Sequence, residues 1–270
     1  MNASGNDSHG ARRLAVILGG GDADTRALGI LASVLREFSP EVAGLFLEDV
    51  DLFRLAQLPF SCEISRLTSR AQPLTTIELE REVRVQAVRA ERALRVTAER
   101  AGLKWSFQRM RGRLNMALEA APNVNLLLLS ATRRNIISSG EAGALGRALR
   151  ASEGEPTRPI VAVFDGSDPA TVALQSAIRL SRSTNRRLEV ILVAATTDAA
   201  AELRGRAVQL LAPQTATLRR VPDMAIETLT DAIRAHAPAL LVIGANKLFL
   251  ESPGVGLLRR SIDCPALIVR

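Results

Sequence analysis

The sequence has few of the residues that carry recognisable chemistry. Its 270 residues include seven Phe, one Trp, two His and two Cys. So few aromatic side chains are a poor supply for base-stacking platforms, and a nucleic-acid function is not expected. Cys62 and Cys264 stand far apart with no Cys-x-x-Cys pair, which excludes the usual zinc and disulfide frameworks and suits a reducing compartment.

Long apolar runs and catalytic motifs are also missing. No stretch approaches the ~18 apolar residues that cross a bilayer, so no membrane insertion is expected and the cytoplasm is the predicted location. There is no Gly-x-Ser-x-Gly elbow, no His-Glu-x-x-His and no metal-spaced carboxylate cluster. His9 lies in the N-terminal tail, and His236 is expected to be solvated at a helix end. We therefore predict no catalytic residue and no metal site, although an enzyme of another chemistry stays an alternative.

The positive charge is almost all arginine and is spread evenly. Residues 1–157 hold 21 basic and 18 acidic side chains, and residues 158–270 hold 14 and 10. The net charge of +7 is thus not gathered in a dedicated nucleic-acid arm. With 47% apolar and 23% charged residues, the chain is a globular protein able to bury a large core.

One stretch shows a clear strand–turn–helix pattern. The apolar run 160–164 predicts a strand buried on both faces, and Asp165-Gly166-Ser167 predicts a tight turn after it. Asp168 is expected to cap the following helix, in which Pro169 suits the first position. This unit would open a parallel sheet.

The same pattern occurs earlier in the chain. Residues 14–18 run into Gly19-Gly20-Gly21-Asp22, and a constant offset pairs this unit with the later one. Residues 42–47 match 188–193, and residues 126–130 match 240–244. The chain is therefore predicted to hold two copies of one α/β unit.

These matches define the expected organisation. Residues 1–10 form a disordered tail, 11–157 a first unit with an insert at 48–76, and 158–270 a second unit. The insert is interpreted as a short helix and loop folded onto the sheet, with a partner surface or a lid as alternatives. In the long helix predicted over 77–101, Glu80–Arg84 and Glu91–Arg95 are expected to pair. A last helix of the first unit is predicted over 140–150, followed by a polar linker at 152–157.

The first unit lacks a fifth strand of its own. Its fourth strand, predicted over 124–129, would therefore leave an unpaired edge. We expect the strand at 266–269 to lie between the two fourth strands and to join both sheets into one.

Three segments together resemble the universal stress protein family: 161–170, 240–244 and 264–269. The resemblance covers 158–270 and, more weakly, 12–151. It implies two tandem doubly wound parallel-sheet units with strand order 3-2-1-4-5, the first lacking its fifth strand. In members that bind ATP, the acidic residue after the first strand contacts the adenosine part, and that residue is Asp165 here. A loop Gly-x2-Gly-x9-Gly-Ser/Thr after the fourth strand holds the ribose and phosphates.

This loop departs from the family pattern. Gly244 is present, but Lys247 replaces the second glycine, and Leu257-Leu258 replace the final pair. In a shorter loop, Ser252-Pro253 would align with that pair instead, and Gly254 and Gly256 lie near. Glycines matter here because backbone N–H groups must approach phosphate oxygens closely. Lys247 supplies charge without rebuilding the cradle. The candidate cofactor-binding set is Asp165, Gly166, Ser167, Gly244, Lys247, Gly254 and Gly256.

The first copy departs further, because Gly19 and Ser130 replace Asp165 and Gly244. We expect no nucleotide there and no cofactor overall, with weak ATP or AMP binding in the second copy as the exception. The predicted function is a non-catalytic stress-response protein that acts through protein partners or self-association. The alternative is a sensor of ATP or another adenine nucleotide, including a slow ATPase.

Overall fold

The computed structural model describes residues 13–19, 22–38, 41–64, 71–119, 124–130, 158–245, 256–258 and 261–270. The predicted tail at 1–10, the helix at 140–150 and the linker at 152–157 lie outside these residues. The limits of the two predicted units, 11–157 and 158–270, stay predictions.

The first part of the chain alternates strands and helices and carries one hairpin. Its elements are β1 (Arg13–Leu18), α1 (Asp22–Phe38), β2 (Glu41–Asp49), α2 (Val50–Ala56), β3 (Cys62–Ile64), β4 (Ala71–Pro73), α3 (Thr76–Arg100), β5 (Trp105–Gly112), α4 (Leu114–Glu119) and β6 (Leu126–Leu129).

The second part repeats the alternation without the hairpin. Its elements are β7 (Ile160–Phe164), α6 (Asp168–Thr184), β8 (Leu188–Val193), α7 (Thr197–Leu211), β9 (Thr217–Val221), α8 (Ile226–His236), β10 (Leu240–Gly244) and β11 (Ala266–Val269).

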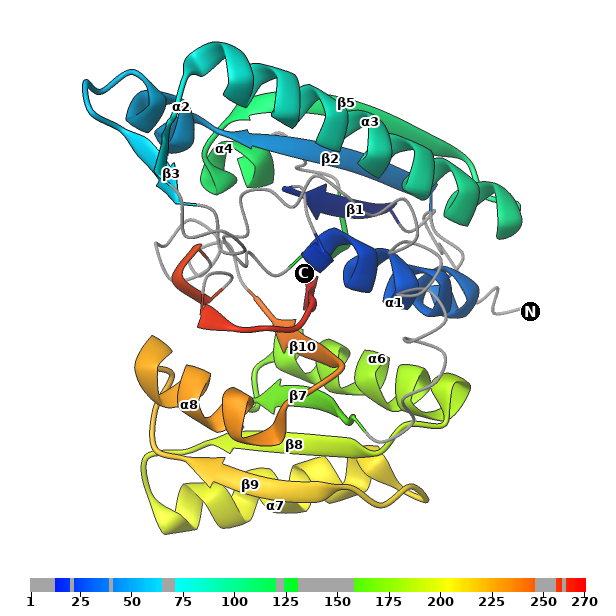
Figure 1. Cartoon of the computed structure of the whole chain (residues 1–270). Coiled ribbons are helices and arrows are strands. Elements are labelled where there is room, and N and C mark those ends of the chain that lie inside the picture. Colours follow the sequence, from blue (N-terminus) through cyan, green and yellow to red (C-terminus); the bar gives the residue numbers. More distant parts are fainter. Residues whose placement is uncertain are drawn as a thin grey trace.

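All strands except β3 and β4 belong to one nine-stranded sheet in the order β5-β2-β1-β6-β11-β10-β7-β8-β9 (Figure 1). The second unit has the order 3-2-1-4-5, and the first has 3-2-1-4, so the predicted fold class is confirmed. The repeated strand–helix units place helices on both faces of this sheet.

Strand β11 is shared by the two units. It runs parallel to β10, with Leu267 beside Val242, and antiparallel to β6, with Leu267 beside Leu128. All four of its residues are buried. The predicted position of residues 266–269 between the two fourth strands is therefore confirmed, and the edge of β6 is covered.

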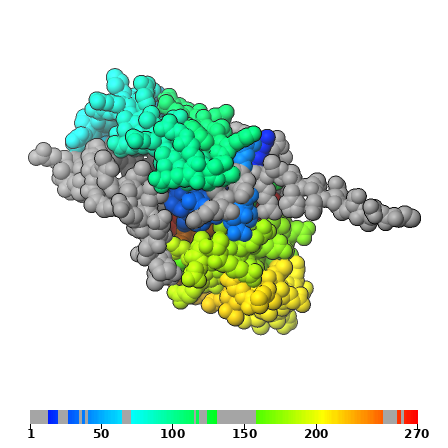
Figure 2. Space-filling model, turned by 90° about the vertical axis from the view of Figure 1, so that its right-hand side faces the viewer, coloured from blue at the N-terminus to red at the C-terminus, as the bar shows by residue number. Residues whose placement is uncertain are grey.

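Two apolar cores lie on the two faces of the sheet. Helices α1, α3, α6 and α7 pack on the first face, where Leu31, Leu94 and Leu174 are fully buried. Helices α4 and α8 contribute to the second core through Ala117, Leu229 and Ile233. In Figure 2, which views the molecule from one side, the colours of α3, α1, α6 and α7 follow one another from top to bottom.

Helix starts follow from local hydrogen bonds. The Thr75 hydroxyl accepts from the Glu78 amide at 3.2 Å and donates to the Glu78 carboxylate at 2.8 Å, which makes a capping box at the start of α3. The expectation that Asp168 caps α6 is wrong: Ser167 is the N-cap, and Asp168 lies in the first turn. Ser167 takes this position because its hydroxyl reaches the Ala170 amide at 3.4 Å.

Helix α3 differs from expectation in its ion pairs. Glu80 pairs with Arg111 of β5 at 3.4 Å instead of with Arg84. Within the part of the chain that the structure describes, Glu91 and Arg95 form no ion pair. Glu80 pairs with Arg111 and not with Arg84 because β5 brings the Arg111 guanidinium to the same end of α3.

The insert forms a compact flap, which we define as residues 50–64 and 71–75. Helix α2 buries Phe53 and Ala56, as predicted for a short helix on the sheet. The expected loop contains a β3–β4 hairpin, in which Cys62 pairs with Pro73 and Ile64 with Ala71. Three-residue strands give too short a pattern to be recognised in the sequence.

Candidate functional site

The predicted site begins at the turn after β7, and this turn is held by its own side chains. Asp165 Oδ1 accepts hydrogen bonds from the Ser167 amide at 2.9 Å and the Ser167 hydroxyl at 2.6 Å. The same hydroxyl accepts from the Ala170 amide and so caps α6. Asp165 and Ser167 are exposed, and Ser167 occupies one oxygen of the Asp165 carboxylate, Oδ1.

Gly166 sits between that turn and helix α7. Its φ is +84°, which a side chain rarely adopts, and an added Cβ would lie 2.6 Å from Leu203 Cδ2. Arg206 Nη2 donates to the Gly166 carbonyl at 2.8 Å, and the Arg206 guanidinium lies 6.0 Å from the centre of the Phe164 ring. Helix α7 is thereby fastened to the turn. No pattern in the sequence singled out Arg206.

Gly244 ends β10 directly against the start of α6. A Cβ at Gly244 would lie 2.2 Å from the Pro169 carbonyl carbon and 2.4 Å from the Ala170 nitrogen. Both atoms are backbone, so a side chain there would have to displace the helix. The packing of α6 against β10 therefore explains why this position is a glycine.

The described site residues share one edge of the sheet. Strands β7 and β10 are parallel neighbours, with Val163 beside Ile243. Asp165 directly after β7 and Gly244 at the end of β10 therefore lie at the same edge, formed by the carboxyl ends of the strands. The chain leaves β7 for β8 on one side and meets β10 on the other, which makes this edge a topological switch point. The structure thus brings Asp165, Gly166, Ser167 and Gly244 together.

The remaining predicted site residues are placed only in part. Lys247 and Gly254 lie outside the described residues. Gly256 is described, and a Cβ built there would meet no atom within 4 Å. Packing therefore sets no requirement for glycine at Gly256, in contrast to Gly244.

The corresponding edge of the first unit carries a buried carboxylate instead. Glu48, near the end of β2, is 6% exposed, and its Oε1 accepts from Arg109 Nε at 3.0 Å and Nη2 at 2.5 Å. Arg111 Nε donates to Glu48 Oε2 at 3.1 Å. Burial acts to raise the pKa of Glu48, but the hydrogen bonds and charges of the two arginines outweigh it and lower that pKa.

Further contacts tie this carboxylate cluster to the flap. The Arg111 guanidinium stacks 3.9 Å above the Phe53 ring, and Arg113 Nη2 lies 3.1 Å from Asp51 Oδ1. Both partners belong to α2. The alternation of Arg109 and Arg111 on β5, continued by Arg113 directly after the strand, signals one shared face in the sequence. Their carboxylate partners lie about sixty positions away, so the pairing itself could not be found there.

His236 also differs from expectation. It was expected to be solvated, but its side chain is 14% exposed and Nδ1 faces the Glu189 carboxylate. Glu189 lies on β8, beneath the last turn of α8. The solvated interpretation is wrong because α8 packs its C-terminal turn onto the sheet instead of ending in solvent.

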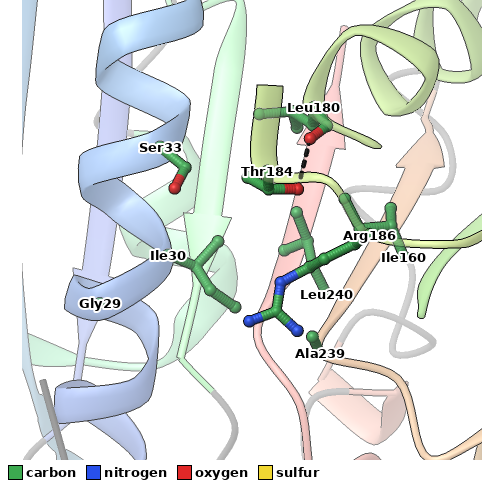
Figure 3. A pocket seen from close by; sticks show the side chains of 9 residues that line it. All are labelled: Gly29, Ile30, Ser33, Ile160, Leu180, Thr184, Arg186, Ala239 and Leu240. Carbon is green, nitrogen blue, oxygen red and sulfur yellow. Dashed lines mark hydrogen bonds between the residues drawn. The ribbon is translucent and has the colours of Figure 1, made fainter. Parts of the chain in front are cut away.

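A small cavity lies at the seam of the two units. It is lined by α1 residues such as Ile30 and Ser33, by Thr184 of α6, and by Arg186, which extends toward Ile30 in Figure 3. Arg186 Nη1 donates to the Arg158 carbonyl at 3.1 Å. The volume of about 40 Å³ is enough for a few water molecules and far below the several hundred Å³ of a nucleotide pocket.

Two absences concern the described residues alone. Among them, no group of three or more His, Cys, Asp or Glu side chains is placed to hold a metal ion. None of the helices built from these residues is long and apolar enough to span a membrane.

Comparison with known proteins identifies the architecture. A universal stress protein from Archaeoglobus fulgidus DSM 4304 is similar over 95% of this chain and 98% of its own, with 14% identity and a TM-score of 0.51. A universal stress family protein from Burkholderia pseudomallei matches 43% of this chain and 98% of its own, at 24% identity and a TM-score of 0.33.

A universal stress protein in complex with cAMP matches 42% of this chain and 96% of its own, at 21% identity and a TM-score of 0.34. No protein-family model and no curated protein sequence matches the chain. The chain therefore has the fold of a tandem universal stress protein. At the level of fold, the resemblance seen in the sequence is confirmed.

Proposed function

We propose that this chain is a non-catalytic stress-response protein that works by binding other proteins or further copies of itself. The universal stress fold supports the class, and the state of the turn after β7 supports the absence of nucleotide chemistry. We further expect the protein to act in the cytoplasm.

The observation that carries the proposal is the structural use of the candidate nucleotide residues. Asp165 Oδ1 accepts from Ser167, and the Gly166 carbonyl accepts from Arg206. The backbone of α6 occupies the space beside Gly244 that a side chain would need. A phosphate cradle needs open backbone N–H groups that a ligand can approach. The described part of the site fits a triphosphate poorly.

The flap supplies a surface suited to a partner. Phe60 is 99% exposed and adopts a φ of +71°, an unfavourable conformation for a bulky residue that holds its ring in solvent. Leu55, Leu58 and Ile64 of the same flap are also exposed. An apolar group of this kind is typical of a protein-binding surface.

An adenine-nucleotide sensor stays the alternative. It is favoured by the position of Asp165 at the switch point between β7 and β10, where ligands of such sheets bind. In that case the exposed Asp165 would contact the adenosine part, and Lys247 would supply charge to a phosphate.

Thermal denaturation with added nucleotide separates the two functions. A ligand present at ~100 times its dissociation constant stabilises a protein by about 2.7 kcal/mol. We expect no shift in melting temperature with millimolar ATP, AMP or cyclic AMP, with or without magnesium. A shift that is lost in Asp165→Ala would establish the sensor; a shift that survives this substitution would place the nucleotide elsewhere.

The partner role is tested at the flap. Phe60→Ser and Leu58→Ser should leave the melting temperature unchanged, because both side chains are exposed, and should remove binding partners or self-association. Quantitative co-purification and sedimentation velocity measure these losses. An unchanged partner set and an unchanged oligomeric state would clear the flap of any binding role.

A further inference from the structure

Helix α3 presents a long outward face that is both basic and aliphatic. Opposite its buried stripe lie seven exposed side chains that share one side of the helix, and we call them the basic face. They are Ile77, Arg81, Arg84, Val85, Val88, Arg92 and Arg95. The face extends for about 27 Å along the axis at 1.5 Å per residue.

Ion pairs with the described part of the chain do not neutralise the charge of this face. Among the described residues, none of its four arginines takes part in an ion pair or a hydrogen bond. Of the five glutamates of α3, Glu91 and Glu99 form no ion pair among the described residues, and Glu99 lies at the C-terminal end of this face. The other three are used elsewhere. Glu78 closes the capping box, Glu80 pairs with Arg111, and Glu82 accepts a hydrogen bond from Gln86 at 3.1 Å.

The aliphatic residues lie within this line of charge. Val88 is 58% exposed, Val85 37% and Ile77 80%. Arg81, Val85, Val88, Arg92 and Arg95 follow each other at steps of four, three, four and three residues, the spacing with which one helix contacts another. Along the described helix layer α3 lies beyond α1, and only the short helix α2 contacts it from the flap (Figures 1 and 2).

We propose that the basic face of α3 binds an acidic amphipathic helix of a partner protein. The partner's aliphatic side chains would cover Val85 and Val88, and its carboxylates would pair with the flanking arginines. This proposal rests on the proposed function and names the chemistry of its partner. Charge complementarity of this kind selects partners and steers their encounter.

Other occupants fit the face less well. A second copy would bring arginine against arginine, which costs several kcal/mol in an interface. Single-stranded nucleic acid would need aromatic side chains for stacking, and the face has none. A membrane surface helix uses Trp, Phe or Leu on its apolar side, whereas this face offers one Ile and two Val.

A displayed library of 21-residue helical peptides tests the proposal on the full chain. Its polar positions vary among Glu, Lys and Gln, and its apolar positions vary between Leu and Ala. Wild-type protein should enrich peptides of negative net charge with apolar residues at three- and four-residue steps. Fluorescence anisotropy with the most enriched peptide should then show affinity at least about tenfold weaker for the variant Arg84→Glu/Arg92→Glu and for Val88→Asp.

The second unit offers matched controls. Arg204 is exposed on α7, and Val208 is 52% exposed on the same helix. Arg204→Glu makes one such charge reversal and Val208→Asp makes the same apolar-to-acidic change, and both should leave peptide binding within twofold. Circular dichroism checks that every variant is folded.

Each result bears on the proposal. No enrichment, enrichment of neutral or basic peptides, or equal weakening by the α7 variants would overturn it. Tighter binding to a 20-base-pair DNA duplex or to phosphatidylcholine–phosphatidylserine vesicles than to the peptide would also overturn it. A failure here with no nucleotide binding leaves the proposed function standing, whereas a nucleotide shift lost in Asp165→Ala removes that function whatever the peptides do.

Discussion

The two units carry different polar residues at the carboxyl ends of their strands. In the second unit, Asp165, Gly166 and Ser167 close a tight turn, and Gly244 lets α6 rest on β10. In the first unit, Gly19 and Ser130 occupy the matching positions, and the neighbouring strands β2 and β5 carry the buried Glu48 with its two arginines. One scaffold thus supports two unrelated polar arrangements.

The two copies share the sheet and differ in the polar residues at the strand ends. Strand order, register and the buried β11 require only apolar residues at fixed positions. The polar residues at the strand ends are free to vary around them. In the first unit this freedom is used to anchor the flap, through Phe53 beneath Arg111 and Asp51 beside Arg113.

The outer helices α3 and α7 extend the contrast. Helix α3 has 25 residues and leaves four arginines of its basic face unpaired among the described residues. Helix α7 has 15 residues, and its Arg206 is directed inward to the Gly166 carbonyl. The outer helix of the first unit therefore exposes its arginines, whereas Arg206 of the outer helix of the second unit stabilises the turn after β7.

The strongest test of the shared sheet is Leu267→Ala in β11. Leu267 is fully buried and lies beside Leu128 of the first unit and Val242 of the second. A cavity there should cost about 2–5 kcal/mol. Trp105, on β5 of the first unit, is the one tryptophan and reports unfolding by fluorescence.

If β11 couples the units, urea transitions followed by Trp105 fluorescence and by far-ultraviolet circular dichroism shift together in this variant. A Trp105 transition that stays in place while the dichroism transition moves would show that the units unfold independently.

Gly244→Ala tests how tightly β10 and α6 pack at the strand ends of the second unit. The added methyl group meets backbone atoms of Pro169 and Ala170, so we expect a loss of about 1–3 kcal/mol in unfolding free energy. Gly205→Ala on α7 is the control, because its Cβ meets nothing within 4 Å and alanine favours a helix by about 1 kcal/mol. Equal stability of the wild type and Gly244→Ala would refute the packing role.

Glu48→Gln should cost about 1–2 kcal/mol at neutral pH, because charge-assisted hydrogen bonds to Arg109 and Arg111 are lost while both guanidinium groups keep access to solvent. The pKa of Glu48 is lowered in the folded state. Its stabilisation is therefore present above the pKa of the unfolded chain and is lost as pH falls through the lower, folded value.

Urea denaturation across acidic pH measures this effect. The wild type and Glu48→Gln should converge in stability as the pH falls below the usual range of a glutamate. A constant difference at every pH would contradict the ion-pair account.

The smallest expected effect is at Glu63 in the flap. Burial, followed by the charges of Glu82 and Glu78, raises the pKa of Glu63, so its charged form is disfavoured in the folded state. Glu63→Gln should stabilise the protein by a few tenths of a kcal/mol at neutral pH, and the gain should vanish in acid. Destabilisation at neutral pH would show that Glu63 instead has a favourable partner.

Much of this fold could be predicted from the sequence because apolar runs and their repetition are local signals. The bounds of β7 and the bridging position of β11 follow from such patterns. The prediction that Asp168 caps α6 was wrong because Asp168 and Ser167 are both good N-cap residues, and only the turn geometry decides between them. The prediction of a solvated His236 was wrong because its partner Glu189 lies far away in the chain.

The candidate site was predictable to a smaller extent. The turn at Asp165–Ser167 follows from its residue types, but its closure by Arg206 depends on how α7 packs. Gly244 was chosen as a phosphate-loop glycine, and the structure gives it a packing task as well. Whether the site residues bind any ligand stays a prediction.

Equilibrium dialysis of the full chain against radiolabelled ATP and magnesium is the most direct test of the central claim that the second unit has kept the scaffold without an open nucleotide cradle. At millimolar ATP we predict no retained label above that of Asp165→Ala. One ATP bound per chain, and lost in Asp165→Ala, would contradict the claim and make this protein a nucleotide sensor.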